Sequence, residues 1–440
     1  MSKKEIRFFP IFIGATAGVM LEIIATLVDE IVVGNLLTDE AFAAVNLIEP
    51  FTLFEVFIAY LITVAGAALI VRAHGAGDHE KMSELFSQTI IECGICGIAL
   101  TLIYILFTPQ LVKFVADDPS VYEDALAYFT AIRFYPLVDM FDTFMFAYVL
   151  YRGGYVYFYT GIFARIGLNV LLSWLLGSQM GLFGIGLASI ISLIVALLIK
   201  LIFLLNKKKH GLSFRWYFNA RVALQIAVIG FPESALSLFI VLFELAINSF
   251  TLQKYGVAGV TAVAVAINIF EFTFYLSEGI SEYEIVAVND SIGKKSSASM
   301  NHAIKMTLRA AMIEGAVLVG LILFGSDVLP EAFDIDNAKT AQLASVLLMI
   351  ISPTALFICL TRVTSIFYQY TKRLLRTLIL FGSAITLLPI LFSVLFGQIA
   401  LEGIAIGIAL GPVAAIMLMY GYVHWIKKEK LFDYSLMNLE

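Results

Sequence analysis

Long apolar stretches that recur along the whole chain constrain its fold more than any other feature. Each stretch has about 20 residues or more, which is enough for a helix to cross the hydrocarbon core of a bilayer. Helices suit this environment because they satisfy their backbone hydrogen bonds internally. The sequence therefore predicts an all-α integral membrane protein with about twelve transmembrane helices. The predicted spans are residues 8–35, 46–72, 84–108, 124–151, 155–176, 181–205, 222–252, 257–289, 301–325, 337–366, 375–396 and 402–425.

The composition argues against every class of soluble protein. Of the 440 residues, 60% are hydrophobic and 14% are charged, whereas soluble domains carry about 25% charged residues. The mean hydropathy is +0.93. A soluble domain has too little core to hide so much apolar surface.

Basic residues concentrate in alternate loops, and the loops between them are acidic. Loops rich in Lys and Arg stay on the cytoplasmic side of a membrane. The basic positions include Lys3, Lys4, Arg7, Arg72, Lys81, Arg152, Lys207, Lys208, Lys209, Lys294, Lys295, Lys372, Arg373, Arg376, Lys427, Lys428 and Lys430. We therefore expect a multi-pass protein of the cell (plasma) membrane with both termini in the cytoplasm.

The chain matches itself when it is shifted by 222 residues. Pairs of special residues that align are Pro10 with Pro232, Glu22 with Glu244, Gly34 with Gly256, Asn46 with Asn268 and Glu49 with Glu271. This duplication predicts an N-lobe at 1–205, a cytoplasmic linker at 206–221 and a C-lobe at 222–440. Because six helices per lobe is an even number, the lobes are predicted to be parallel repeats. Such repeats are related by a pseudo-two-fold axis along the membrane normal.

Several short motifs occur in a fixed order along the chain. They are Asp29-Glu-Ile-Val-Val-Gly34, Ala43-Ala-Val-Asn-Leu47 with Pro50, Gly66-Ala-Ala-Leu-Ile-Val-Arg72, Arg152-Gly-Gly154, Asn169, Gly184-Ile-Gly-Leu-Ala-Ser189 and Gly230-Phe-Pro232. Together they resemble the multidrug and toxic-compound extrusion (MATE) family of transporters. The chain departs from the family pattern at Pro10, one turn before the usual proline. It departs again at Ser173, where an acid often follows the asparagine of the fifth helix.

The resemblance implies a secondary active exporter and not an enzyme. Organic cations or other amphipathic drugs and toxins would be exported by proton or sodium antiport, with alternating access between the two lobes. The coupling ion is then the only cofactor that we expect. The expected partners are a small amphipathic substrate and membrane lipid, with no nucleic acid, and the chain is expected to be a monomer.

Asp29, near the end of the first predicted span, is the leading candidate for the coupling acid. A charge buried in a membrane costs at least a few kcal/mol, so this carboxylate should be protonated, paired, bound to a cation or facing water. Asn169, Ser173 and Ser189 complete the predicted ion-coupling group. Asp29, Asn169 and Ser189 would offer hard oxygen ligands if the ion is sodium. The alternative is a hydrated acid that caps a loop.

Other acids within the predicted spans are candidates to line a substrate cavity. They are Glu22, Glu244, Glu271 and Glu278. Glu271, Glu278 and Glu282 recur at spacings of seven and four, which places them on one face of a continuous helix. Such a stripe would attract a lipophilic cation or hold a proton. The alternative is that Glu282 and Glu284 lie near the cytoplasmic surface and are solvated.

Two rival functions remain open. A lipid-linked oligosaccharide flippase of a related family would carry an anionic diphosphate and need a basic cavity, built from residues such as Arg133, Arg165 and Arg362. We expect these arginines instead to form internal salt bridges with acids such as Asp139 and Asp142. A membrane-embedded transferase would need an intramembrane His or a catalytic acid pair beside a large loop domain, and neither is evident in the sequence.

Overall fold

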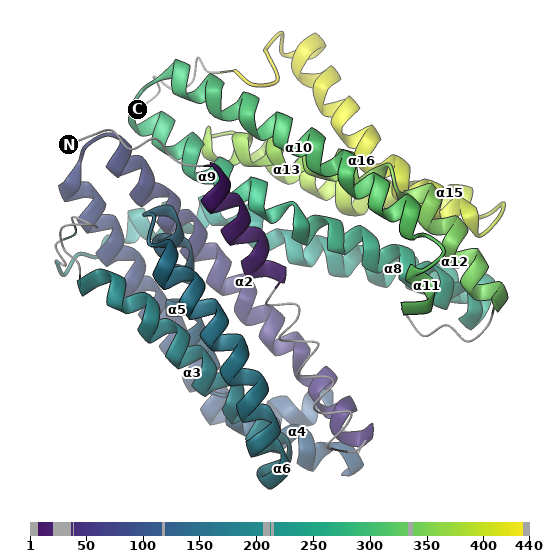
Figure 1. Cartoon of the computed structure of the whole chain (residues 1–440), viewed down its shortest axis with the longest axis horizontal. Coiled ribbons are helices and arrows are strands. Elements are labelled where there is room, and N and C mark those ends of the chain that lie inside the picture. The colour runs from purple at the N-terminus through teal and green to yellow at the C-terminus, as the bar shows by residue number, and fades with distance from the viewer. Residues whose placement is uncertain are drawn as a thin grey trace. The chain divides into compact units, whose positions relative to one another are not determined.

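The structure is a computed structural model that describes residues 8–20, 37, 39–116, 119–205, 212, 215–332 and 338–433. Within these ranges the chain is helical and forms no strand (Figure 1). The chain divides into two compact units, Arg7–Ser234 and Ala235–Glu440. The boundary between these units lies inside a helix, after the predicted linker, so the predicted lobe boundaries stay predictions.

The first unit is built from helices that pack along one another (Figure 1). Its elements are the helix Phe8–Met20, α2 (Asp39–Gly75), α3 (His79–Val115), α4 (Pro119–Ile132), α5 (Tyr135–Tyr151), α6 (Tyr155–Ile202) and η1 (Phe203–Leu205). α5 contacts both α3 and α6. Ile48, Phe129 and Ile185 belong to an apolar core shared by α2, α4 and the second half of α6.

The second unit begins within α8 (Ala220–Leu276) and runs to the C-terminal helix. Its other elements are α9 (Glu278–Gly293), α10 (Ser297–Gly325), α11 (Leu329–Ala332), α12 (Ala338–Ile351), α13 (Thr354–Tyr370), α14 (Leu374–Phe381), η2 (Gly382–Leu387), α15 (Leu388–Phe396), α16 (Glu402–Gly421) and η3 (Tyr422–Ile426). α15 and α16 pack closely because α16 presents small residues to α15. At Gly407, an added Cβ would lie 2.1 Å from the backbone nitrogen of Ser393.

Two of the long helices fold back on themselves at a glycine. α6 is interrupted at Gly181 (φ 60°) and α8 at Gly256 (φ 67°, ψ −168°). Positive φ is strained for residues with a Cβ atom, so glycine is the residue that permits these reversals. Each folded helix therefore supplies two arms, which coincide with two predicted spans apiece.

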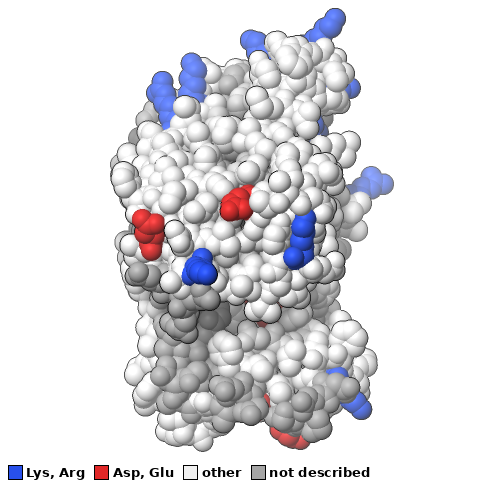
Figure 2. Space-filling view, turned by 90° about the vertical axis from the view of Figure 1, so that its right-hand side faces the viewer, with Lys and Arg blue, Asp and Glu red and all other residues white. Residues whose placement is uncertain are grey.

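The surface has the character expected of a membrane protein. Among the described residues, seven helices are long and apolar enough to cross a membrane, and the bent pair α12–α13 (45°) makes an eighth. Two of the seven are the folded α6 and α8 regions. Large side chains such as Leu106 (67%) and Ile313 (67%) are exposed, and Figure 2 shows a face on which charged side chains are few and scattered. The prediction of a helical membrane protein is confirmed.

Candidate functional site

A pair of glutamates links the two arms of α8 in the second unit. Glu244 lies on the first arm and Glu271 on the second, and their carboxyl groups are hydrogen-bonded to each other. Glu271 Oε1 is buried and has no hydrogen-bond partner in the described part of the chain. A hydrogen bond between two carboxyl groups requires a proton, since two carboxylates at this distance would repel each other. The bend at Gly256 thus brings two of the predicted cavity acids together as a proton-sharing pair.

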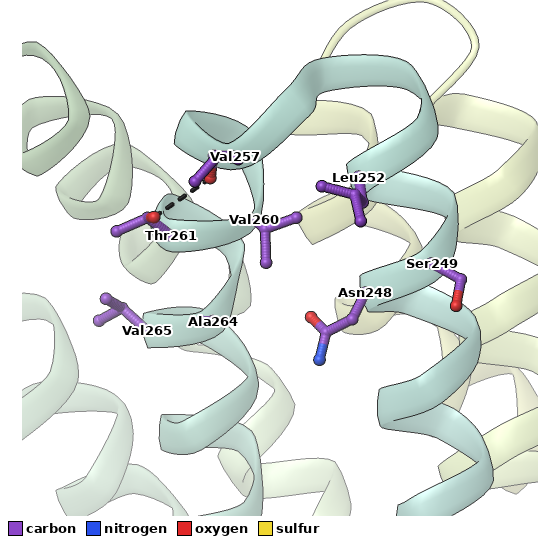
Figure 3. Close-up of a pocket in the computed structure, with 8 residues that line it drawn as sticks. All are labelled: Asn248, Ser249, Leu252, Val257, Val260, Thr261, Ala264 and Val265. Carbon is purple, nitrogen blue, oxygen red and sulfur yellow. Dashed lines mark hydrogen bonds between the residues drawn. The ribbon is translucent and has the colours of Figure 1, made fainter. Parts of the chain in front are cut away.

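A pocket lies between the same two arms, closer to the bend. Its volume is about 520 Å³. The lining residues are Asn248, Ser249, Leu252, Val257, Val260, Thr261, Ala264 and Val265. Figure 3 shows the Asn248 side chain pointing into the space between the arms, while the Thr261 hydroxyl donates to the carbonyl oxygen of Val257 (3.1 Å). The pocket is therefore lined by apolar and neutral polar groups.

The pocket and the carboxyl pair are neighbours along the helix. Asn248 follows Glu244 by one helical turn, a rise of about 6 Å. The Oδ1 atom of Asn248 is buried and lacks a hydrogen-bond partner among the described residues. A ligand that enters the pocket would thus meet an unsatisfied amide oxygen first and a titratable acid pair one turn further on.

Glu278 has a different environment from Glu271. Glu278 is the first residue of α9, which continues from α8 through Ser277. Its Oε2 atom forms an ion pair with Nη2 of Arg362, whose Nε donates to Ser281 Oγ (3.0 Å). Arg362 is 1% exposed, and its expected internal salt bridge is confirmed.

The neighbouring acids of α9 are also inside the protein. Glu282 is 5% exposed and Glu284 is 0% exposed. The alternative that these two acids are solvated at the surface is therefore wrong. The physical reason is that α9 packs against both α10 and α13, which cover it.

The first unit brings together part of the predicted ion-coupling group. Asn169 and Ser189 lie on opposite arms of α6, and Asn169 Nδ2 donates to Ser189 Oγ (3.2 Å). Ser173 lies one turn beyond Asn169 and is fully buried. Asp29 and Glu22 lie outside the described residues, so their places in an ion site and in the cavity stay predictions.

Two buried ionisable residues were missed by the sequence analysis. Lys200 on α6 donates to Asp142 Oδ2 on α5 (2.7 Å), and both side chains are at most 4% exposed. Glu55 on α2 is 1% exposed and is hydrogen-bonded to Asp139 on α5. The available signal was the occurrence of a charged residue inside each apolar stretch, because such residues are rare there.

Across the described part of the chain, no group of three or more His, Cys, Asp or Glu residues could hold a metal ion.

Comparisons with known proteins agree with this architecture. The MatE family model matches residues 15–175 and 232–395, one stretch in each half of the chain. The probable multidrug resistance protein YoeA of Bacillus subtilis (strain 168) is 25% identical over 431 residues, covering 93% of this chain and 91% of the relative. The multidrug export protein MepA of Staphylococcus haemolyticus (strain JCSC1435) is 23% identical over 332 residues, covering 72% and 71%.

A solved structure shares the fold of the whole chain. It is the outward-facing conformation of a multidrug resistance MATE family transporter of the MOP superfamily, with a TM-score of 0.85 and 19% identity. The superposition covers 96% of this chain and 95% of that structure. The prediction of an all-α membrane protein with two lobes is thereby confirmed.

Proposed function

The chain belongs to the MatE family of membrane transporters, and from this premise we propose that it is a secondary active exporter of organic cations or other amphipathic molecules. The single observation that carries the choice of a cationic cargo is the half-buried Glu244–Glu271 pair beside a neutral, largely apolar pocket. An amphipathic cation would place its apolar part in the pocket and its charge at the acid pair. The names of the two relatives, a multidrug resistance protein and a multidrug export protein, support the same cargo class.

Proton antiport follows from the chemistry of the pair. When the shared proton is present, the two carboxyl groups carry one negative charge in total; when it leaves, they carry two. A cation therefore binds more strongly after the proton has been released. Competition between a proton and a cation for one site is sufficient to couple their movements in opposite directions.

The first unit offers a further place for the coupling ion. Asn169 and Ser189 lie together, and we propose that Asp29 approaches them from the first predicted span. A proton on Asp29, or a sodium ion held by oxygens of these three residues, would then bias the lobes between inward-open and outward-open states. We propose that the protein does this as a monomer in the cell membrane, with both termini in the cytoplasm.

The flippase alternative receives less support. An anionic diphosphate would need basic residues that are free to bind it. Arg362 is engaged by Glu278, and Arg165 donates to the hydroxyl of Tyr135 (3.0 Å). These contacts use two of the three arginines that the flippase hypothesis requires.

The proposal is tested by dye efflux from proteoliposomes. A fluorescent lipophilic cation is loaded, and either a proton gradient or a sodium gradient is imposed across the membrane. We expect the proton gradient to drive efflux in the wild type, and both Glu271→Gln and Asp29→Asn to lose it. If neither gradient drives efflux of the wild type, the exporter proposal is wrong and a lipid-linked anionic cargo becomes the next one to test.

A further inference from the structure

We propose that Glu55 and Asp139 form a second proton-binding site, located within the unit Arg7–Ser234 and holding one exchangeable proton. The inference rests on the proposed function only for the role of this proton in transport. The existence of the site itself depends only on the contacts of the two side chains.

The two acids meet in the interior of the first unit. Glu55 lies on α2 and Asp139 on α5, and they are 1% and 6% exposed. Their carboxyl groups lie within hydrogen-bonding reach of each other, and two carboxylates this close would repel each other unless they share a proton. Thr143, one turn further along α5, lies with its hydroxyl 3.3 Å from Asp139 Oδ2. The Thr143 hydroxyl is therefore a hydrogen-bond donor to Asp139 in addition to Glu55.

A lack of hydrogen-bond donors around Glu55 identifies it as the neutral partner. Glu55 Oε1 is buried and has no hydrogen-bond partner among the described residues. A buried carboxylate left without such donors would incur a large desolvation penalty. A neutral carboxyl group that donates its proton to Asp139 incurs far less. The contacts therefore place the shared proton on Glu55, with Asp139 as the charged acceptor.

The surrounding charges agree with one bound proton. Arg165 on α6 lies close enough for its charge to act on Glu55, and its Nη2 donates to the Tyr135 hydroxyl (3.0 Å). Two carboxyl groups that share one proton carry one negative charge, which the guanidinium balances. Without the proton, the three groups would carry a net charge of −1 in an apolar interior, which is costly.

The other helices packed against Glu55 add no charge to this balance in the described contacts. α3 contributes Tyr104, whose hydroxyl donates to the backbone oxygen of Phe51 (2.8 Å) and is therefore used by the backbone of α2. α4 contributes the apolar ring of Phe129, whose centroid lies 4.9 Å from that of Tyr104. Tyr104 and Phe129 thus form an aromatic contact between α3 and α4, and neither side chain carries a charge.

A neighbouring acid on α5 provides an internal contrast. Asp142, three residues after Asp139, is paired with Lys200 at 2.7 Å. A cation neutralises that carboxylate, so it needs no proton. One helix thus carries two buried acids, of which only Asp139 is bonded to another acid.

The Glu55–Asp139 pair gives the first unit an exchangeable proton, which Ser173 cannot provide. The family pattern places a second acid near Asn169, and Ser173 cannot release a proton at physiological pH. Glu55 and Asp139 give the first unit a titratable group on a different pair of helices, α2 and α5. Release of their proton would add a buried negative charge between these helices and favour a state in which water reaches them.

The site is tested by infrared difference spectroscopy on the purified full-length protein in lipid nanodiscs. Protonated carboxyl groups absorb in a region free of other protein bands, and the band shifts when the proton exchanges for deuterium. We expect Glu55→Gln to lose the part of the deuterium-sensitive band that comes from this pair. Glu80→Gln is the matched control, because Glu80 is an exposed acid paired with Arg215, and it should leave the band unchanged.

A second variant keeps the test independent of folding. Asp139→Asn has the same shape, and its amide oxygen can accept the hydrogen bond of a neutral Glu55, so the band of this pair should remain but shift in frequency. If a folded Glu55→Gln protein retains the whole band, or a folded Asp139→Asn protein leaves the band unshifted, the site does not exist. If Glu55→Gln loses the band but the wild type shows no dye efflux, the proton site exists and the exporter proposal is wrong. If the wild type shows efflux but Glu55→Gln keeps the whole band, the exporter proposal holds and the proton site is wrong.

Discussion

At the level of single residues, several acids within the apolar helices are bonded either to a cation or to another acid. Asp142 and Glu278 are each bonded to a cation, Lys200 and Arg362. Glu244 and Glu271 are bonded to each other. A cation-paired acid keeps its charge, whereas an acid bonded to another acid can exchange a proton. This difference separates residues that hold the structure from residues that are suited to transport.

Replacing Glu271 by glutamine should stop coupled efflux. The amide preserves the size and a hydrogen bond to Glu244 but cannot release a proton. We expect the rate of proton-driven efflux to fall at least tenfold, roughly a 1.4 kcal/mol effect, while the protein still folds. Efflux from proteoliposomes measures this, with Glu80→Gln as the control at an exposed glutamate. Wild-type efflux by Glu271→Gln would remove the pair from the coupling mechanism.

Removing Lys200 should destabilise the first unit. Lys200→Met leaves Asp142 as a buried charge without its cation, which typically costs about 3–5 kcal/mol. The double variant Asp142→Leu with Lys200→Met removes both charges and should recover much of this loss. Thermal unfolding in detergent compares the wild type, both single variants and the double variant. If the double variant is as unstable as the sum of the single ones, the salt bridge is not the source of the effect.

At the level of elements, the bend in α8 determines where the pocket and the acid pair meet. Gly256 has φ 67° and ψ −168°, a conformation that is almost exclusive to glycine and costs other residues about 1–3 kcal/mol. An added Cβ would meet nothing within 4 Å, so Gly256→Ala probes the backbone alone. We expect a lower unfolding temperature and weaker dye binding.

Gly320 provides the control for this substitution. It lies inside the regular helix α10 and also has nothing within 4 Å of an added Cβ. Alanine is preferred over glycine within a helix by roughly 0.5–1 kcal/mol. Gly320→Ala should therefore leave stability unchanged or raise it slightly. Equal effects at the two glycines would contradict a special role for the bend.

The segment after η3 should detach from α14 in acid. Glu429 Oε2 accepts from Arg376 Nη1 (2.8 Å), and this bond holds the pKa of Glu429 below its usual value of 4.5. A lowered pKa in the folded state stabilises the contact above pH 4.5, and the stabilisation is lost as pH falls through the lowered pKa. Hydrogen exchange of residues 427–433 should rise in that range. Glu429→Gln should show the faster exchange already at neutral pH and no further change in acid.

The helices were predictable from the sequence, and the contacts between them only in part. Helix positions follow from the length of each apolar stretch, and the reversal at Gly256 follows from a glycine between two such stretches. The predicted stripe of Glu271 and Glu278 lies along one helical region, Ala220–Gly293, but the sequence did not show that Glu271 contacts Glu244 and Glu278 contacts Arg362. The contact of Glu55 with Asp139 depends on how α2 and α5 are rotated about their axes. Local spacing carries no information on that rotation.

At the level of the whole molecule, the internal duplication relates the acids of one pair but not those of the other. Under the shift of 222 residues, Glu244 and Glu271 align with Glu22 and Glu49, of which Glu22 lies outside the described residues. In the second unit the pair joins the two arms of α8, whereas in the first unit it joins α2 and α5.

α2 corresponds to the second arm of α8 together with α9, and α5 corresponds to α13. Glu55 and Asp139 align with Ser277 and Thr361, which lie next to the ion-paired Glu278 and Arg362. The Glu55–Asp139 pair therefore has no acidic counterpart in the second unit.

These positions predict that the two pairs bind their protons independently. Each shared proton is held by groups of its own compact unit, so removing one pair should not change the other. We expect Glu55→Gln and Glu271→Gln each to lose a distinct part of the deuterium-sensitive carboxyl band. The double variant should lose the sum of the two parts. A double variant that loses no more than one single variant would mean that only one pair carries a proton, and coupling would then reside in one unit alone.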